Sequence, residues 1–422
     1  MIRRLKVGFM FDPGEVVPVG EMLRSDNGNI YFQFDAGMLR GPLSPSPFKL
    51  QMIPEPQTPR PNEANVFEGL YGVFADSLPD GWGLIMMSRA MGRSGRQFSS
   101  TSALDRLSYI GNRAMGALIY EPDTSTPDSL EETIELTRIA NEVNRFFKGD
   151  AEDILPELTT LGGSPGGARP KILVGLGTSL ENAKHSRLLT GIDHLPSDYE
   201  HWIIKFRSKD ETPDATLIES IYAKTAHHVG VEMTESRLIE DRDGRFWFAT
   251  KRFDRGPSNS RIHVHSVAGI AHANFRLPSL DYDDLLKITS AVTKRQDDLL
   301  TVFRLAAFNI IFHNRDDHAK NFSFIMSKQG TWRFAPAYDL TYSAGPGGEH
   351  TTSVLGEGRA PTRAHLLKLA DSKGIKKEMA AAIIDEVESG ISFMKDLLRQ
   401  YKVVHSEIQK RLDQWGNQRK AN

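Results

Sequence analysis

The segment NRDDHAKN, residues 314–321, concentrates charged and amide side chains between two apolar stretches of the chain. LTVFRLAAFNIIFH precedes it and FSFIM follows it. A hydrophobic core gains nothing from such a cluster, because every polar group that is buried needs a partner. Side chains of these types bind phosphate groups and hard metal ions, so the segment is a candidate site for phosphate chemistry.

Asp316 and Asn321 have the spacing of the protein kinase catalytic loop, H-R-D-x-x-x-x-N. In that loop the aspartate accepts the proton of the attacking hydroxyl, and the asparagine holds a magnesium ion. Asn314 replaces the histidine, so the segment is related to the motif rather than identical to it. On this interpretation His318 and Lys320 contact phosphate or support the loop. A solvated turn is the alternative for the whole segment.

A kinase site also needs a second carboxylate, presented near the end of a downstream strand, for the metal that bridges the nucleotide phosphates. FSFIM and TWRFAPAYDL predict a hairpin with its turn at residues 327–330, and Asp339 stands at its end. Asn321 and Asp339 are therefore predicted to converge on one Mg²⁺, which takes oxygen ligands. A turn-forming or helix-capping role is the alternative for Asp339.

Lys205 lies in HWIIKFR, residues 201–207, which predicts a strand. Alternation places Ile203 and Lys205 on one face and the large apolar side chains on the other. A lysine in so apolar a strand needs an anion, and the phosphates of ATP are the candidate. Glu219, on the helix predicted over 212–230, is expected to orient it, as in the kinase Lys–Glu pair. An edge strand with the ammonium in water is the alternative.

A glycine-rich segment, LTTLGGSPGGARPKILVGL, precedes the strand predicted around Lys171. Glycines let backbone N–H groups approach phosphates closely, although the segment is not a Walker A motif. A flexible hinge is the alternative. The residues predicted to contact the nucleotide here are Gly163, Ser164, Gly166, Gly167, Ala168 and Lys171.

The predicted elements divide the chain into three parts. Residues 1–125 mix short apolar segments with glycine and proline and predict a strand-rich subdomain. Residues 126–254 predict a mixed sheet with a helix against it, which is the ATP-binding part of the N-terminal lobe. Residues 255–422 predict a helical C-terminal lobe that carries the catalytic loop. The expected fold is α+β and two-lobed, like a protein kinase, with an all-α second lobe and a ligand cleft between the lobes.

The composition excludes several classes of function. Among 422 residues, Lys and Arg number 52 and Asp and Glu 54, so the net charge of −2 does not favour direct wrapping of nucleic acid. The absence of cysteine excludes thiolate zinc sites and thiol nucleophiles and fits a reducing compartment. No apolar stretch approaches the ~20 residues of a membrane helix. A cytoplasmic protein without a membrane partner is therefore expected.

A metal-dependent hydrolase is the competing interpretation of the same segment. Asp317 and His318 are neighbours of the types that bind zinc or manganese. Such a site needs further ligands, which His263, His265 or His272 could supply. Ordinary loop and core positions are the alternative for these histidines, and bonding of the loop backbone is the alternative for Asp317.

Six segments resemble, in this order along the chain, motifs of the HipA-like serine/threonine kinases, the toxins of bacterial type II toxin–antitoxin pairs. The best matches to the family's patterns are the segments at 70–83 and 314–324. In places the chain departs from the family, as with Pro165 in the glycine loop and Lys251, where members often have glutamate. The segments are LYGVFADSLPDGWG (70–83), GGSPGGARPKI (162–172), IIK (203–205), KRFDR (251–255), NRDDHAKNFSF (314–324) and AYDL (337–340).

The resemblance implies specific roles for these residues. Asp316 is implied as the catalytic base, Asn321 and Asp339 as Mg²⁺ ligands, and Lys205 as a contact of ATP phosphate. Ser164 is implied as an autophosphorylation site that switches the enzyme off. The family's hinge segment implies nucleotide contacts at Arg252, Phe253 and Asp254.

The resemblance also implies partners. A helix-turn-helix antitoxin like HipB would bind both the kinase and operator DNA, so that DNA is contacted mainly through the antitoxin. Relatives phosphorylate aminoacyl-tRNA synthetases or other translation proteins, and a protein of this kind is the implied substrate. A small-molecule phosphotransferase and a catalytically weak co-repressor that binds the antitoxin remain as alternatives.

Overall fold

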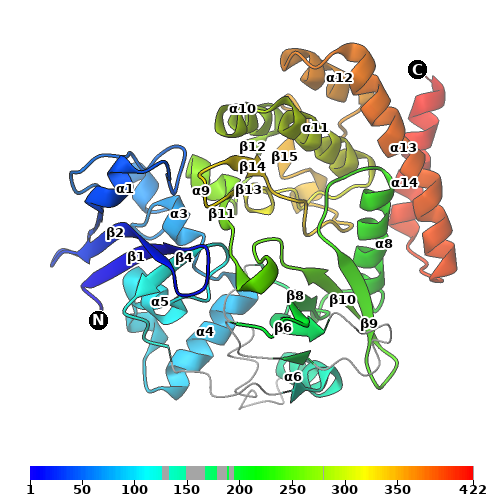
Figure 1. The fold of residues 1–422 in the computed structure, drawn as a ribbon. Coiled ribbons are helices and arrows are strands. Elements are labelled where there is room, and N and C mark those ends of the chain that lie inside the picture. The colour runs from blue at the N-terminus through cyan, green and yellow to red at the C-terminus, as the bar shows by residue number, and fades with distance from the viewer. Residues whose placement is uncertain (126–132, 149–166, 178–187, 190–193, 279, 422) are drawn as a thin grey trace.

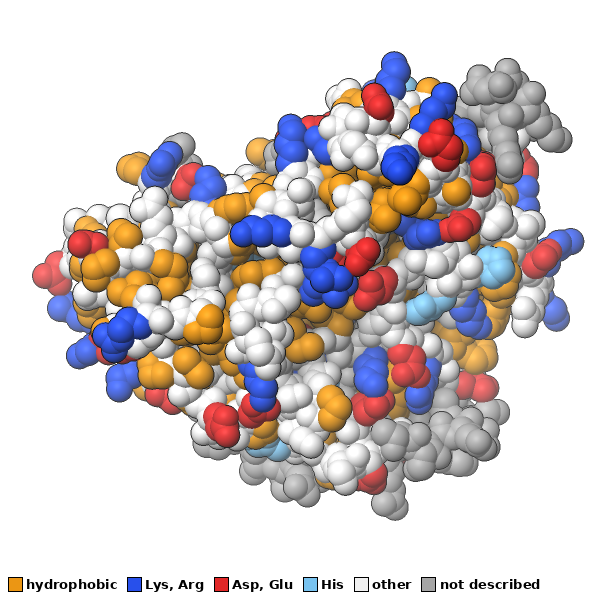
Figure 2. All heavy atoms as spheres, turned by 45° about the horizontal axis from the view of Figure 1, so that its top comes forward, with side chains coloured by type: hydrophobic (Ala, Val, Ile, Leu, Met, Phe, Trp, Pro, Cys, Tyr) orange, Lys and Arg blue, Asp and Glu red, His pale blue; other side chains and the backbone are white. Residues whose placement is uncertain are grey.

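The computed structural model describes residues 1–125, 133–148, 167–177, 188–189, 194–278 and 280–421, and its elements form three neighbouring groups (Figure 1). Within the described residues, no helix is both long and apolar enough to cross a membrane. Positive and negative side chains are interspersed over the face in Figure 2, in keeping with the net charge of −2.

The N-terminal group is built on an antiparallel sheet of order β3-β2-β1-β4, with helices α1, α3, α4 and α5 around it (Figure 1). The apolar segment KVGFMF contributes most of the first strand, β1, in agreement with the strand-rich subdomain that is predicted. The core of this group contains Phe9, Phe32, Phe74 and Leu104. Its elements are β1 (Arg4–Met10), β2 (Val16–Arg24), β3 (Ile30–Phe34), α1 (Ala36–Arg40), α2 (Pro61–Ala64), α3 (Gly72–Ala75), α4 (Gly81–Arg93), α5 (Ala103–Ile110) and β4 (Leu118–Glu121).

A second sheet, of order β5-β7-β6-β8-β10-β9, forms the middle of the chain. The predicted strand around Lys205 and the following helix are confirmed, and β9 and β10 form a hairpin with Asp243-Gly244 at its turn. The elements are β5 (Thr133–Ile134), α6 (Leu136–Lys148), β6 (Lys171–Gly177), β7 (Leu188–Leu189), β8 (Tyr199–Lys205), α8 (Ala215–His228), β9 (Ser236–Glu240) and β10 (Phe246–Lys251).

The C-terminal group is mainly helical, but the expectation of an all-α lobe is wrong in detail. Five short strands form a three-stranded sheet, β11-β13-β14, and a two-stranded pair, β12-β15. The strands are β11 (His263–Ser266), β12 (Leu280–Asp281), β13 (Ser323–Met326), β14 (Trp332–Phe334) and β15 (Thr352–Ser353). The helices are α9 (Val267–Ala271), α10 (Tyr282–Thr293), α11 (Gln296–Ile311), α12 (Arg363–Ser372), α13 (Lys377–Gln400) and α14 (Ser406–Ala421), with the 3-10 turn η4 (Ala319–Asn321).

One helix and one hairpin of the C-terminal group position the candidate chemistry. α11 is buried along most of its length, so the segment that follows it starts from a rigid support. β13 and β14 form the predicted hairpin, with a turn through Ser327 and Gly330. The catalytic-loop candidates therefore lie between a core helix and a hairpin, as the sequence pattern predicts.

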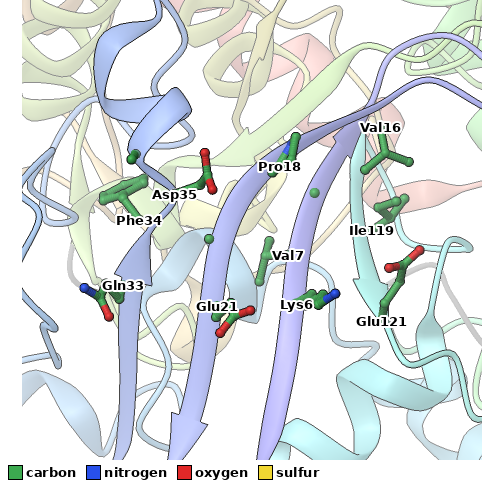
Figure 3. Close-up of a pocket in the computed structure, with 13 residues that line it drawn as sticks. Lys6, Val7, Val16, Pro18, Glu21, Gln33, Phe34, Asp35, Ile119 and Glu121 are labelled. Carbon is green, nitrogen blue, oxygen red and sulfur yellow. The ribbon is translucent and has the colours of Figure 1, made fainter.

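A groove of about 470 Å³ lies on the open face of the N-terminal sheet, where Lys6, Glu21 and Glu121 come from three different strands (Figure 3). Gly8 and Gly20 in β1 and β2 also line it. Its lining includes none of the residues predicted for phosphate chemistry. The groove and the candidate site are therefore separate features of the molecule.

Candidate active site

Two lysines face each other on neighbouring strands of the middle sheet. Lys171 in β6 is the cross-strand partner of Lys205 in β8, and each is only 5% exposed. The large apolar side chains of β8, including Trp202 and Ile204, pack on the opposite face. Like charges placed directly opposite destabilise a sheet, so this pair requires negative charge close by. Burial, reinforced by Lys205, lowers the pKa of Lys171 despite the carboxylates around it.

Glu219 supplies part of that negative charge. It lies in α8, is 1% exposed, and accepts a hydrogen bond of 2.5 Å from the Lys205 ammonium, so the predicted pairing is present. Its other oxygen accepts from Arg169, which is also paired with Glu211 at 2.9 Å. A buried glutamate between two cations holds the lysine in a fixed position.

Asp339 supplies the rest and joins the two lobes. Its carboxylate forms an ion pair with Lys205, although 134 residues separate them in the chain. Burial opposes ionisation, but Lys205 and Lys171 hold the pKa of Asp339 well below its ordinary value. Its φ of +55° is in the left-handed region, which is uncommon for a residue with a side chain. Such strain is typical of functional sites, where surrounding contacts impose it.

Asp316 lies next to these groups, at the start of the loop after α11. Partial burial, with the negative charges of Asp339 and Asp317, raises the pKa of Asp316, although its side chain remains 58% exposed. The ring of His318 lies 3.8 Å from its carboxylate. A carboxyl that is accessible and has a raised pKa is suited to accept a proton.

Asn321 is tied to the same loop and carries an oxygen donor of its own. Its side-chain amide donates a 2.7 Å hydrogen bond to the backbone carbonyl of Asp316. The amide oxygen of Asn321 and the carboxylate of Asp339 are hard ligands of the kind that Mg²⁺ prefers. Asn321 contacts Asp316 through this hydrogen bond, and the negative charge of Asp339 acts on the Asp316 carboxyl. The donor chemistry thus fits the metal that the sequence predicts here.

The two residues that flank Asp316 have structural contacts that the sequence did not predict in full. Arg315 donates to the backbone carbonyls of Gly348 and Arg359, at 2.5 and 2.7 Å. Asp317 is buried and accepts from Tyr282 and His350, as well as from backbone N–H groups of 351–352. The contacts with the backbone agree with the alternative role for Asp317, which is bonding of the loop backbone. Together the two residues tie segment 344–359 to the loop that contains Asp316.

Of the predicted glycine-loop residues, Gly163, Ser164 and Gly166 lie outside the described residues. Gly167 and Ala168 are described and lie against Gly81, at the start of α4. The Lys171 ammonium also lies close to Gly167. A Cβ added to Gly167 would be 2.6 Å from the Lys171 nitrogen. The end of the glycine segment therefore reaches the lysine pair.

Lys320 reaches a residue that the site prediction omitted. Its ammonium forms an ion pair with Asp80 at 2.6 Å and lies 4.8 Å from the centre of the Phe275 ring. Asp80 lies in LYGVFADSLPDGWG, which carried the family resemblance, but its distance of 240 residues from Lys320 gave no signal of contact.

The hinge residues Arg252 and Asp254 do not converge on the lysine pair with their side chains. They form a buried bidentate ion pair with each other, at 2.7 and 2.9 Å. Asp254 also bonds Arg255 and the backbone N–H of Gly116, which ties the hinge to the N-terminal group. Phe253 stacks on Tyr338, the residue before Asp339, with ring centres 5.7 Å apart.

The histidines of the hydrolase interpretation lie at the boundary with the N-terminal group. His263 bonds the carbonyl of Pro45, His265 bonds Asp76, and His272 accepts from the backbone of Gly72. Within the described ranges, no group of three or more His, Cys, Asp or Glu side chains is arranged to hold a metal ion. These histidines have structural partners that account for their burial.

Comparisons with known proteins agree with this geometry. Residues 163–392 match the family model described as the HipA-like C-terminal domain, and residues 15–121 match the HipA N-terminal domain. No curated protein matches the sequence.

Two solved structures provide comparisons of the fold. HipA in its complex with HipB and operator DNA, from the toxin–antitoxin system of Shewanella oneidensis MR-1, has 15% identity and a TM-score of 0.67, covering 98% of this chain and 95% of that one. The proinflammatory kinase CtkA of Helicobacter pylori has 12% identity and a TM-score of 0.35, covering 52% and 88%. The first likeness confirms the predicted two-lobed α+β fold.

Proposed function

The chain belongs to the HipA family, and from this premise we propose that it is an ATP- and Mg²⁺-dependent kinase that phosphorylates serine or threonine in a protein. One observation carries the proposal: Lys205, Glu219 and Asp339 meet at the lobe boundary, beside Asp316. The strand lysine, the helix glutamate and the downstream aspartate come from distant parts of the chain. Charged side chains that converge in this way are typical of a phosphotransfer site and not of a hydrophobic core.

Each residue has a distinct task in this proposal. Lys171 and Lys205 bind the phosphates of ATP, whose negative charge relieves the repulsion between the two ammonium groups. Asp316 orients the substrate hydroxyl and accepts its proton at a carboxylate oxygen as the γ-phosphorus is attacked in line. Asn321 and Asp339 would hold Mg²⁺, which when bound neutralises charge on the phosphate oxygens. His318 and Lys320 support the loop that holds Asp316.

Regulation by autophosphorylation at Ser164 is part of the proposal and rests on the family resemblance. A phosphoserine carries roughly −2 charge. The charge would lie in the segment that leads to Gly167 and Lys171, where the phosphates of ATP are proposed to bind. Repulsion between the two anions would push the glycine loop out of its ATP-binding shape. Gly163 and Gly166 are proposed to supply backbone donors in the unmodified loop, and Phe253 to lie beside the base.

The partners follow from the same premise. The similar structure from Shewanella oneidensis contains HipB and operator DNA. We infer a helix-turn-helix antitoxin like HipB for this chain too, with DNA bound mainly through it, since the net charge of the chain is −2 and the face in Figure 2 carries both signs of charge. The proposed substrate is a cytoplasmic translation protein, such as an aminoacyl-tRNA synthetase.

The intact mass of the purified protein before and after incubation with Mg-ATP tests the proposal. A gain of one phosphate, mapped to Ser164 and lost in Asp316→Asn, is the expected result. Phosphoproteomics of a lysate treated with the enzyme then separates a protein kinase, which modifies proteins, from a small-molecule phosphotransferase, which does not. A protein that neither hydrolyses ATP nor modifies itself would instead be a co-repressor, and the kinase assignment would be wrong.

A further inference from the structure

Asp80 occupies the N-cap position of α4, but its carboxylate does not perform the usual capping role. Aspartate at this position normally accepts a hydrogen bond from the first turn of its own helix. Within the described part of the chain, no side-chain cap bond is present at this end of α4. One carboxylate oxygen instead accepts from the backbone N–H of Gly167, and the other lies 2.6 Å from the Lys320 ammonium.

The contact with Gly167 is part of a close fit between α4 and the end of the glycine segment. The Trp82 backbone N–H donates to the Gly167 carbonyl at 3.1 Å, and the Trp82 indole donates to the Lys171 carbonyl, also at 3.1 Å. A Cβ at Gly81, whose φ is +45°, would lie 2.5 Å from the Gly167 carbonyl oxygen. Only glycine fits there. The segment Asp80-Gly81-Trp82 therefore fixes the backbone that enters β6.

The contact with Lys320 fixes the opposite side of the site. Lys320 lies between Asp316 and Asn321, and its backbone carbonyl accepts a 2.9 Å hydrogen bond from Tyr338, the neighbour of Asp339. The two side chains of the Asp80–Lys320 pair are 17% and 20% exposed, so water screens them less than a surface pair. Although burial opposes ionisation, the Lys320 charge keeps the pKa of Asp80 below its ordinary value.

We propose that Asp80 is a positioning residue for phosphoryl transfer, because it connects the strand that binds ATP phosphates with the loop that carries the catalytic base. The inference rests on the proposed function and extends it to the N-terminal group. That group then completes the active site rather than only supporting it. A small change in separation between reacting groups lowers rate strongly: a 1 Å misplacement costs about 100-fold. Phosphate binding by Lys171 and Lys205 does not depend directly on the ion pair.

Steady-state kinetics of wild type, Asp80→Asn, Lys320→Met and the double variant test the inference. Each single variant should lower kcat about 10- to 100-fold, while the KM for ATP stays within about threefold, since the lysine pair is intact. The double variant should be no slower than the slower single variant, because Asp80 acts through Lys320. A purely structural role would lower the Tm but leave kcat unchanged at temperatures where the variants are folded.

A matched control is available in the same protein. Asp12 and Lys328 form another Asp–Lys pair, at 3.1 Å, between the N-terminal group and the β13–β14 turn, and neither is among the residues proposed for the site. Asp12→Asn should leave kcat within about twofold of wild type.

The outcomes separate the two proposals. No phosphate transfer by wild type would refute the proposed function itself. An active wild type with kcat unchanged in Asp80→Asn, or with multiplying losses in the double variant, would overturn the role of Asp80. If Asp80→Asn does not fold, Lys320→Met decides: unchanged kcat refutes the inference, and a fall in kcat at unchanged KM supports it.

Discussion

Asp316 and Asp317 are adjacent and chemically identical, yet the structure predicts opposite consequences for their substitution by asparagine. The Asp316 side chain is 58% exposed and lies near His318, whereas that of Asp317 is buried and accepts four hydrogen bonds. Asp316→Asn should therefore abolish most phosphate transfer without loss of stability. A general base typically contributes about 10²- to 10⁴-fold to the rate.

Asp317→Asn should instead destabilise the C-terminal lobe. The amide keeps one acceptor oxygen for Tyr282, His350 and the two backbone donors, and it removes a buried charge. Loss of one partner in a buried charged network costs about 3–5 kcal/mol. At about 2–4 °C per kcal/mol for a domain of this size, the Tm should fall by about 6–20 °C.

The assay combines transfer of labelled phosphate from ATP with thermal unfolding of both variants. Turnover within tenfold of wild type in Asp316→Asn would refute the assignment of the base. A Tm within 2 °C of wild type in Asp317→Asn would show that the buried hydrogen bonds do not stabilise the lobe as argued.

Three further tests concern the lysine pair, the base and the subdomain boundary. Lys205→Met should lower kcat about 10²- to 10³-fold, as loss of one charge-stabilising donor does, and raise the KM for ATP, measured by initial rates; near-normal values would contradict phosphate binding by Lys205. Asp316 acts as a base only when its carboxyl is deprotonated, and its pKa is raised above the ordinary 3.8. A pH profile of kcat/KM should therefore fall on the acid side at a pH above 3.8, and a profile that is flat down to pH 4 would contradict this. Burial lowers the pKa of His263 to about 3 from its ordinary 6.5. Between these two values the unfolded chain binds the proton first, so His263 alone should lower the unfolding free energy by about 1.4 kcal/mol per pH unit as the pH falls. Urea titrations of His263→Gln should show a shallower slope than wild type, and an equal slope would contradict this.

Much of the fold was predictable from local pattern. α10, α11 and α13 repeat apolar residues at helical spacing, and the β9–β10 hairpin has an Asp-Gly turn. The β13–β14 hairpin was predicted, but β11, β12 and β15 were not, since two to four residues are too few to establish a periodicity of two. Their pairing depends on neighbours that packing brings together, such as β11 with β13 across some 60 residues.

The sequence determined the types of group at the site and their local spacing. Three features were predictable in this way: D-x-x-x-x-N at 316–321, the carboxylate at the end of a hairpin, and the lysine in an apolar strand. Each lies in or beside a single helix or strand, and backbone geometry fixes the spacing of side chains within such an element over a few residues. The choice of partner is different, because it depends on how distant elements pack.

The tertiary structure decided that Arg252 and Asp254 bond each other, that Asp317 is buried while Asp316 is accessible, and that Asp80 meets Lys320. These outcomes depend on which apolar faces are buried together, and no charge or spacing along the chain specifies them. A carboxylate acquires its role from the dielectric and the charges around it, and in this protein those surroundings come from three groups of elements that meet only after folding.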